Sequence, residues 1–293
     1  MRHLFAFLAL IVLTACASVA IQEFETYKTA FDKTNQASSA ILDQLALQER
    51  ALFLRRYKYA KSGTHFDPDL APYFTDATDP PGTAAFRGSL EVVKAYNDLL
   101  YGLETGQTSQ ALAAKLSAME SATTGGITAT SGVLSAAVPS VSAGLTASMT
   151  VLNTAFSNML PFIQLGLKYR AQEEFRIFLV QNYDAVHAIL AHLRSSTAVI
   201  FPILTAASVR ASNVDPTGAI SAEDSKRIET YRKLLADWVI LIDATIKALD
   251  RAKVAAEAPP TISDTISGLT SAAIDMETAS KSARTHLAEL ASK

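Results

Sequence analysis

The sequence predicts an all-α fold, an elongated antiparallel bundle of about five or six long helices with heptad and eleven-residue seams. Nearly every segment of the 293-residue chain repeats its apolar residues with helical rather than alternating spacing. Alanine and serine are plentiful, and aromatic residues make up only 8% of the chain, which favours closely packed helices over sheets. No long linker divides residues 16–293, so we expect them to form one domain.

Residues 1–15 have the three-part layout of a secretory signal peptide. A short basic start precedes an apolar run over Leu4–Val12, and small residues follow. The junction LTAC at residues 13–16 resembles the lipobox of bacterial lipoproteins. That resemblance implies cleavage before Cys16, lipidation of its thiol and acylation of its new amine, and more than one acyl chain anchors a protein stably. In such lipoproteins an Asp after the cysteine favours the inner membrane, so Ala17 implies the outer membrane, facing the periplasm.

Two other interpretations of this region stay open. Leu4–Ile21 carries no charge and is just long enough for an uncleaved membrane-spanning helix. Cys16 is the only cysteine, and it would otherwise be an ordinary buried thiol. In every case residues 16–293 can form no internal disulfide, so their stability must come from packing.

The first helix of the domain is expected over residues 18–60. Residues 61–82 are expected to form a loop, because they contain four prolines and four aspartates. Another helix is expected over Thr83–Met119, weakened in its middle by Gly102 and Gly106. The apolar positions that mark these two helices are Phe24, Tyr27, Phe31, Ile41, Leu45, Leu52, Phe86, Leu90, Val93 and Leu100.

The segment 121–167 contains no Asp, Glu, Lys, Arg or His, in a chain that is 18% charged. Its apolar residues recur every eleven positions, which corresponds to about 3.67 residues per turn and indicates a straight helix. We expect kinks at Pro139 and Pro161. The eleven-residue rows are Ile127, Val138, Met149 and Leu160; Val141, Leu152 and Ile163; and Leu134, Leu145, Phe156 and Leu167.

Two interpretations of segment 121–167 follow. Helices without a charged side are usually buried, which predicts an inner helix surrounded by neighbours. A charge on either side, from Ala136→Glu or Leu145→Lys, would then destabilise the domain. The alternative is membrane insertion, as a pore wall with a hydroxyl-rich side or as a hairpin against the anchoring membrane. In gross layout the chain loosely resembles the α-helical pore-forming cytolysins, in which a charge-poor segment lies among long bundled helices.

Three more helices are expected towards the C-terminus. One covers residues 170–210 with a kink at Pro202, and the next begins at a capping box formed by Ser221 and Asp224. The last two carry heptad seams, which are typical of helices that pack at shallow angles. The seam positions are Ile228, Tyr231, Leu235, Trp238, Ile242, Thr245, Leu249, Ala252 and Ala256, then Ile262, Ile266, Leu269, Ala273, Met276, Ser280, Ala283, Leu287 and Leu290.

Few residues have the spacing of a metal site. Asp184 and His187 share one helix side, but a carboxylate–His site in a bundle needs a second such pair, and the other histidines supply none. Four loop aspartates do not have the spacing of a twelve-residue calcium loop, and turn-forming Asp beside Pro accounts for them. These aspartates are Asp67, Asp69, Asp76 and Asp79.

Two further features point to contacts. The 61–82 loop is long for a compact bundle, which predicts a contact surface with Phe66, Tyr73 and Phe74 as its anchors. Arg55–Lys61 is a basic run with interleaved aromatic residues that suits lipid phosphates or a polyanion. Cations at the end of a helix also interact favourably with the helix dipole, which explains the run without a ligand.

The sequence therefore predicts a lipid-anchored protein of the cell envelope that works by contact. A net charge of −2 gives no reason to expect nucleic acid as a partner. The sequence shows no convergent acid, base and nucleophile, so we expect no enzyme, no cofactor and no metal, with an enzyme or metal-binding bundle as an alternative. The expected partners are the membrane, through Cys16, and other envelope proteins or copies of the chain, through helical faces.

Overall fold

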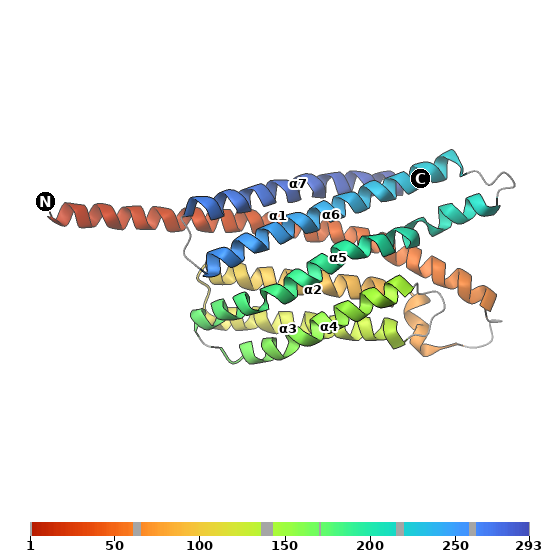
Figure 1. Ribbon diagram of the computed structural model, residues 1–293, viewed down its shortest axis with the longest axis horizontal. Helices are drawn as coiled ribbons and strands as arrows, with labels where there is room; N and C mark the ends of the chain where they lie inside the picture. Colours follow the sequence, from red (N-terminus) through yellow and green to blue (C-terminus); the bar gives the residue numbers. More distant parts are fainter. Residues whose placement is uncertain are drawn as a thin grey trace.

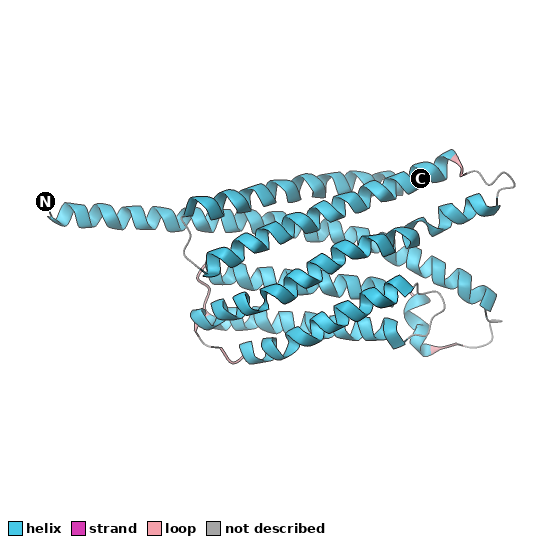
Figure 2. Ribbon diagram, viewed as in Figure 1, coloured by secondary structure: helices cyan, strands magenta, loops and turns pink. Residues whose placement is uncertain are grey.

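The computed structural model describes residues 2–60, 66–135, 143–169, 171–214, 220–257 and 262–292, and their regular elements are all helices (Figure 2). The all-α prediction is confirmed. The described residues form seven α-helices and one short 3-10 helix, more than the number expected. They are α1 (Arg2–Ala60), η1 (Pro68–Tyr73), α2 (Pro81–Glu104), α3 (Ser109–Ser135), α4 (Ala143–Gly166), α5 (Gln172–Val214), α6 (Ala222–Glu257) and α7 (Ile262–Ala291).

One extra helix arises because the expected helix over Thr83–Met119 is broken at Gly106. This glycine has a φ of 69°, in the left-handed region that a side chain disfavours. The amide of Gln107 donates to the carbonyl of Gly102 at 2.9 Å, and the amide of Gly106 donates to that of Leu103 at 3.1 Å. These two bonds form a Schellman motif, so Gly106 ends α2 instead of weakening a continuous helix.

The charge-free segment is divided between two helices, so α2, α3 and α4 replace the two helices expected over residues 83–167. The segment forms the C-terminal part of α3 and the whole of α4, which run antiparallel beside each other along one side of the molecule (Figure 1). Residues 136–142, with Ala136 and Pro139, lie outside the described residues. The Asn153 side chain of α4 donates to Thr130 at 2.8 Å and to Ser131 at 3.1 Å on α3, so the hairpin has its own internal link.

The α-helices run back and forth along one long axis (Figure 1). α7 packs on α1 and α6, and α3 packs on α2 and α4, while α5 contacts α1, α2, α4 and α6. In the described part of the chain, Ile177–Arg210 of α5 is the one stretch long and apolar enough to cross a membrane. Its side chains Phe178, Leu193 and Ile200 are buried between the other helices, as expected for the central helix of a bundle.

Most described positions of the heptad seams are buried, while Ile228, Leu287 and Leu290 are partly buried. Ser221 also caps α6 as predicted, since its hydroxyl accepts the amide of Asp224 at 3.0 Å and donates to the Asp224 carboxylate at 2.8 Å. The buried seam residues are Tyr231, Leu235, Trp238, Ile242, Thr245 and Leu249 on α6, and Ala273, Met276, Ser280 and Ala283 on α7.

Candidate functional site

From residue 121 onward, the outer sides of α3 and α4 form a surface without a charged side chain, while Lys115 and Glu120 lie in the earlier part of α3. Its apolar members Val151, Phe162 and Leu165 are 49%, 50% and 51% exposed, respectively. We define the uncharged face as the exposed residues of this segment: Ser121, Thr124, Gly125, Thr128, Ser131, Thr146, Ala147, Thr150, Val151, Thr154, Ser157, Asn158, Pro161, Phe162, Gln164 and Leu165.

The inner-helix interpretation is wrong for the described residues of this segment. The inner side of α4 is buried, since Met149, Leu152 and Phe156 have no exposed surface, and this confirms the central positions of the eleven-residue stripe within α4. The opposite side of α4 is open, because α4 packs on α2, α3 and α5 from one side only. The expectation for Ala136 falls outside the described residues.

Three threonine hydroxyls of the uncharged face are bonded within their own helices. Thr128 donates to the carbonyl of Thr124, Thr150 to that of Thr146, and Thr154 to that of Thr150, each at 3.0 Å. Covering a polar group is costly chiefly when it loses a hydrogen bond to water without replacement. These hydroxyls keep their bonds when covered, so the face can be buried against a partner at low desolvation cost.

Gly125 and Gly126 are adjacent in α3, but Gly126 lies on its buried side and Gly125 lies on its exposed side. A Cβ added at Gly126 would lie 2.6 Å from the ring of the fully buried Phe156. A Cβ at Gly88 of α2 would lie 3.1 Å from the Cα of Gly126, so the two helices cross closely here. Gly125 has nothing within 4 Å of its added Cβ, so contacts inside the chain do not require a glycine there.

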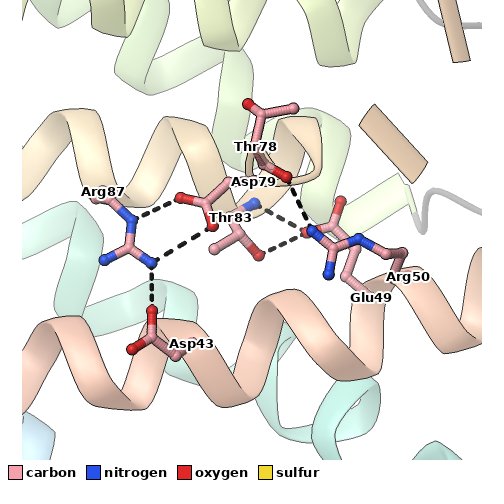
Figure 3. Close-up of polar contacts among 7 residues, drawn as sticks. All are labelled: Asp43, Glu49, Arg50, Thr78, Asp79, Thr83 and Arg87. Atoms are coloured by element: carbon pink, nitrogen blue, oxygen red, sulfur yellow. Dashed lines mark hydrogen bonds and ion pairs between the residues drawn. The ribbon is translucent and has the colours of Figure 1, made fainter. Parts of the chain in front are cut away.

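A second polar site joins the loop before α2 to α1 (Figure 3). Glu49 of α1 is buried, and its carboxylate accepts the amides of Gly82 at 3.1 Å and Thr83 at 2.8 Å and the Thr83 hydroxyl at 2.8 Å. Burial raises the pKa of Glu49, and these hydrogen bonds and a longer one from Tyr73 oppose the shift. Glu49 thus caps the N-terminus of α2 from another helix, where the helix dipole favours an anion. Sequence reasoning missed this residue.

Two arginines hold the loop beside Glu49, and Figure 3 shows Arg50 donating to the carbonyl of Thr78 and Arg87 donating to Asp79 and Asp43. Arg50 donates to Asp76 at 2.9 Å, and Arg87 bridges Asp79 at 2.5 Å and Asp43 at 2.8 Å. Asp67 instead caps η1, accepting the amide of Asp69 at 3.1 Å. The aspartates act separately in fixing the loop, and the described residues contain no His, Cys, Asp or Glu cluster suited to a metal ion.

The aromatic residues of the loop divide into a buried anchor and an exposed pair. Tyr73 is buried and stacks on Phe53 of α1, with ring centroids 3.9 Å apart. Phe74 contacts the same ring edge-on, and Phe66 is tilted against Phe74. Phe66 and Phe74 are 64% and 43% exposed, so the predicted contact surface retains two of its three anchors on the outside.

The Asp184–His187 pair of α5 is not brought together with a second such pair. Asp184 forms an ion pair with Lys253 of α6 at 3.7 Å, and the His187 ring lies 5.7 Å from that of Tyr183.

Sequence reasoning missed a different carboxylate–imidazole contact. Asp237 of α6 lies 2.7 Å from Nδ1 of His286 of α7, and both side chains are largely buried. This contact joins the two seam helices. In the sequence, Asp237 and His286 each directly precede a position of the heptad seams, which was the one indication of this contact.

The two remaining predicted sites lie at opposite ends of α1. Cys16 belongs to α1, where no side chain before Glu25 is described. In the basic run, Arg55 donates to the carbonyl of Ala51 at 3.1 Å in the last turns of the helix. Residues 61–65 lie outside the described residues.

Comparisons of the chain with protein-family models, with curated proteins and with solved structures found no significant match.

Proposed function

We propose that the protein is a lipid-anchored component of a bacterial envelope that works by contact through the uncharged face of α3 and α4. The lipobox-like junction before Cys16 supports the anchor, and Ala17 supports an outer-membrane location facing the periplasm. The partners are other envelope proteins or further copies of the chain. The heptad seams of α6 and α7 support a rigid antiparallel bundle as the scaffold of this surface.

The uncharged face is the observation that carries the contact function. A water-exposed helix side normally contains Lys and Glu, whereas this surface extends over two helices without one charge. Three of its Thr hydroxyls are bonded internally, and its three half-exposed apolar residues lie on α4. A partner that covers this face therefore buries apolar area without burying unpaired charges.

A photo-crosslinking amino acid tests the contact in intact cells. Placed at Thr150 or Thr154, it should yield discrete crosslinked species, because these positions lie in the uncharged face. Thr285 of α7 is the matched control, since it is also exposed and its hydroxyl is bonded to Lys281 of its own helix. Equal crosslinking at Thr285, or none at Thr150 and Thr154, would contradict the proposal.

The anchor is tested separately by Cys16→Ser. The variant should leave the membrane fraction and become soluble, because it lacks the thiol that would be lipidated. A variant that stays membrane-bound would refute lipid attachment at Cys16 while leaving the contact function to be judged by crosslinking.

Membrane insertion of α3 and α4 is a second candidate function. The two helices have 27 and 24 residues, so each is about 36–40 Å long, enough for a hydrocarbon core of about 30 Å. The buried stripe of α4 would face lipid and the hydroxyl-rich side would face water. Dye release from liposomes by the wild type, blocked by Leu145→Lys, would support this function, and no release would refute it.

A further inference from the structure

The contact between α4 and α5 contains a buried polar cluster. The hydroxyls of Ser148 on α4 and Ser196 on α5 lie 3.3 Å apart, and Ser196 donates to the carbonyl of His192 at 2.8 Å. The His192 imidazole is hydrogen-bonded to the backbone of Ser148. His192 therefore links α5 directly to the charge-free helix α4.

One ring nitrogen of His192 has no partner. Nε2 is buried and forms no hydrogen bond, so Nδ1 is the nitrogen that donates to the Ser148 carbonyl. Burial lowers the pKa of His192 from its ordinary value of 6.5, and the bond to Ser148 opposes the shift. The His192 side chain as a whole is half-buried, but its Nε2 is not exposed, so a proton there would add a cationic donor without an acceptor, which is unfavourable.

Among the described residues, no charged side chain contributes to the pKa shift of His192, whose causes are burial and the bond to Ser148. α4 contains no ionisable residue, so it cannot supply a carboxylate. Arg194 of α5 pairs with Asp243 of α6 at 2.7 Å. On α1 and α2, Asp43 is held by Arg87 at 2.8 Å. Asp184 of α5 pairs with Lys253 of α6 at 3.7 Å.

We propose that protonation of His192 loosens α4 from α5 in mildly acidic solution, so that α4 moves away from α5 while it stays bound to α3. The opening would expose apolar side chains of α4, such as Met149 and Leu152, that are fully buried in the closed bundle, whereas Phe156 also packs against Gly126 of α3. In the open form the imidazole titrates near 6.5, whereas the closed form resists protonation. The stability of the contact is therefore fully present above about pH 6.5 and is lost as the pH falls below it.

Hydrogen exchange on the full chain tests this release. After correction for intrinsic exchange rates, the opening constant of α4 should rise about tenfold between pH 7.5 and pH 5.5. The reason is that the His192 imidazole of the open form binds a proton at the lower pH. The exchange of α6 and α7 should change little. In His192→Gln the rise should disappear, whereas the nearby control His187→Gln should keep it.

Two results would overturn the proposal: protection of α4 that is the same at both pH values, or an acid-induced rise that persists in His192→Gln. If that variant fails to fold, an NMR titration of wild-type His192 decides instead. A midpoint below 6.5 would support the proposal, and a midpoint at or above 6.5 would contradict it. These measurements need neither membrane nor partner, so their outcome is distinct from that of the contact function.

Discussion

Gly125 and Gly126 occupy consecutive positions of α3 but have opposite structural roles. A Cβ at position 126 would overlap the buried ring of Phe156, whereas a Cβ at position 125 would point into open space. Gly126→Ala should lower the free energy of unfolding by about 1–3 kcal/mol through overpacking. Gly125→Ala should raise it by about 0.5–1 kcal/mol, because alanine is the better helix former.

Urea unfolding of the two glycine variants measures both effects. Destabilisation by Gly125→Ala similar to that by Gly126→Ala would contradict the assignment of position 125 to the open side of α3. The same pair offers a functional readout: if a partner's helix approaches closely at the uncharged face, Gly125→Leu should weaken crosslinking from Thr150 without lowering stability.

Glu49 is the residue on which the loop before α2 depends. Glu49→Gln replaces one carboxylate oxygen by an amide group that faces the amides of Gly82 and Thr83. Leaving such buried donors unsatisfied should lower the free energy of unfolding by about 1–3 kcal/mol at neutral pH. The control Glu91→Gln, on the exposed side of α2, should stay within about 0.5 kcal/mol of wild type. Equal effects of the two variants in urea unfolding would refute the capping role.

At the scale of the helix, α4 should tolerate charge on one side only. Leu145 is buried in the stripe, so Leu145→Lys should lower the free energy of unfolding by about 3 kcal/mol or more. Thr154 is exposed, so Thr154→Lys should stay within about 0.5 kcal/mol of wild type. Thermal melting of both variants without the lipid anchor measures the difference. Strong destabilisation by Thr154→Lys would restore the inner-helix interpretation.

The periodic parts of the fold could be predicted from the sequence because they depend on local spacing. The seam through Tyr231 and Trp238 and the eleven-residue stripe through Leu145 and Phe156 are both buried. The break at Gly106 was harder to predict from the sequence. A glycine ends a helix when the amides that follow it donate to the last carbonyls of the helix, and otherwise it only weakens the helix. That one side of α4 is exposed could not be predicted from the sequence, since internally bonded hydroxyls occur on both buried and exposed helices.

Tertiary polar contacts explain what sequence reasoning missed in the sites. Glu49 has the sequence context of an ordinary surface residue, and its role depends on Gly82 and Thr83, which lie 33 and 34 positions away. The contact between Asp237 and His286 spans 49 positions in the same way. The length and aromatic content of the loop predicted a contact surface, but they did not show that Tyr73 is instead buried against Phe53, and contact through Phe66 and Phe74 stays a prediction.

At the scale of the whole molecule, α1 sets the distance between the proposed anchor and the aromatic loop. The helix is continuous from Arg2 to Ala60, so residues 16–60 span about 66 Å at 1.5 Å per residue. The N-terminus and the loop after α1 lie at opposite ends of the long axis (Figure 1). An anchored bundle would thus present the uncharged face along its flank and Phe66 and Phe74 at its far end.

The mass of the anchored protein, extracted in mild detergent and measured by light scattering after size-exclusion chromatography, tests the contact function most directly. The wild type should elute in an assembly heavier than one processed chain of residues 16–293 with its lipids and detergent. Thr150→Lys with Thr154→Lys should release the monomer, because lysines would leave buried charges in the contact. The matched pair Thr278→Lys with Thr285→Lys on α7 should leave the assembly intact. A monomeric wild type, or an assembly that survives lysines at positions 150 and 154, would contradict the account.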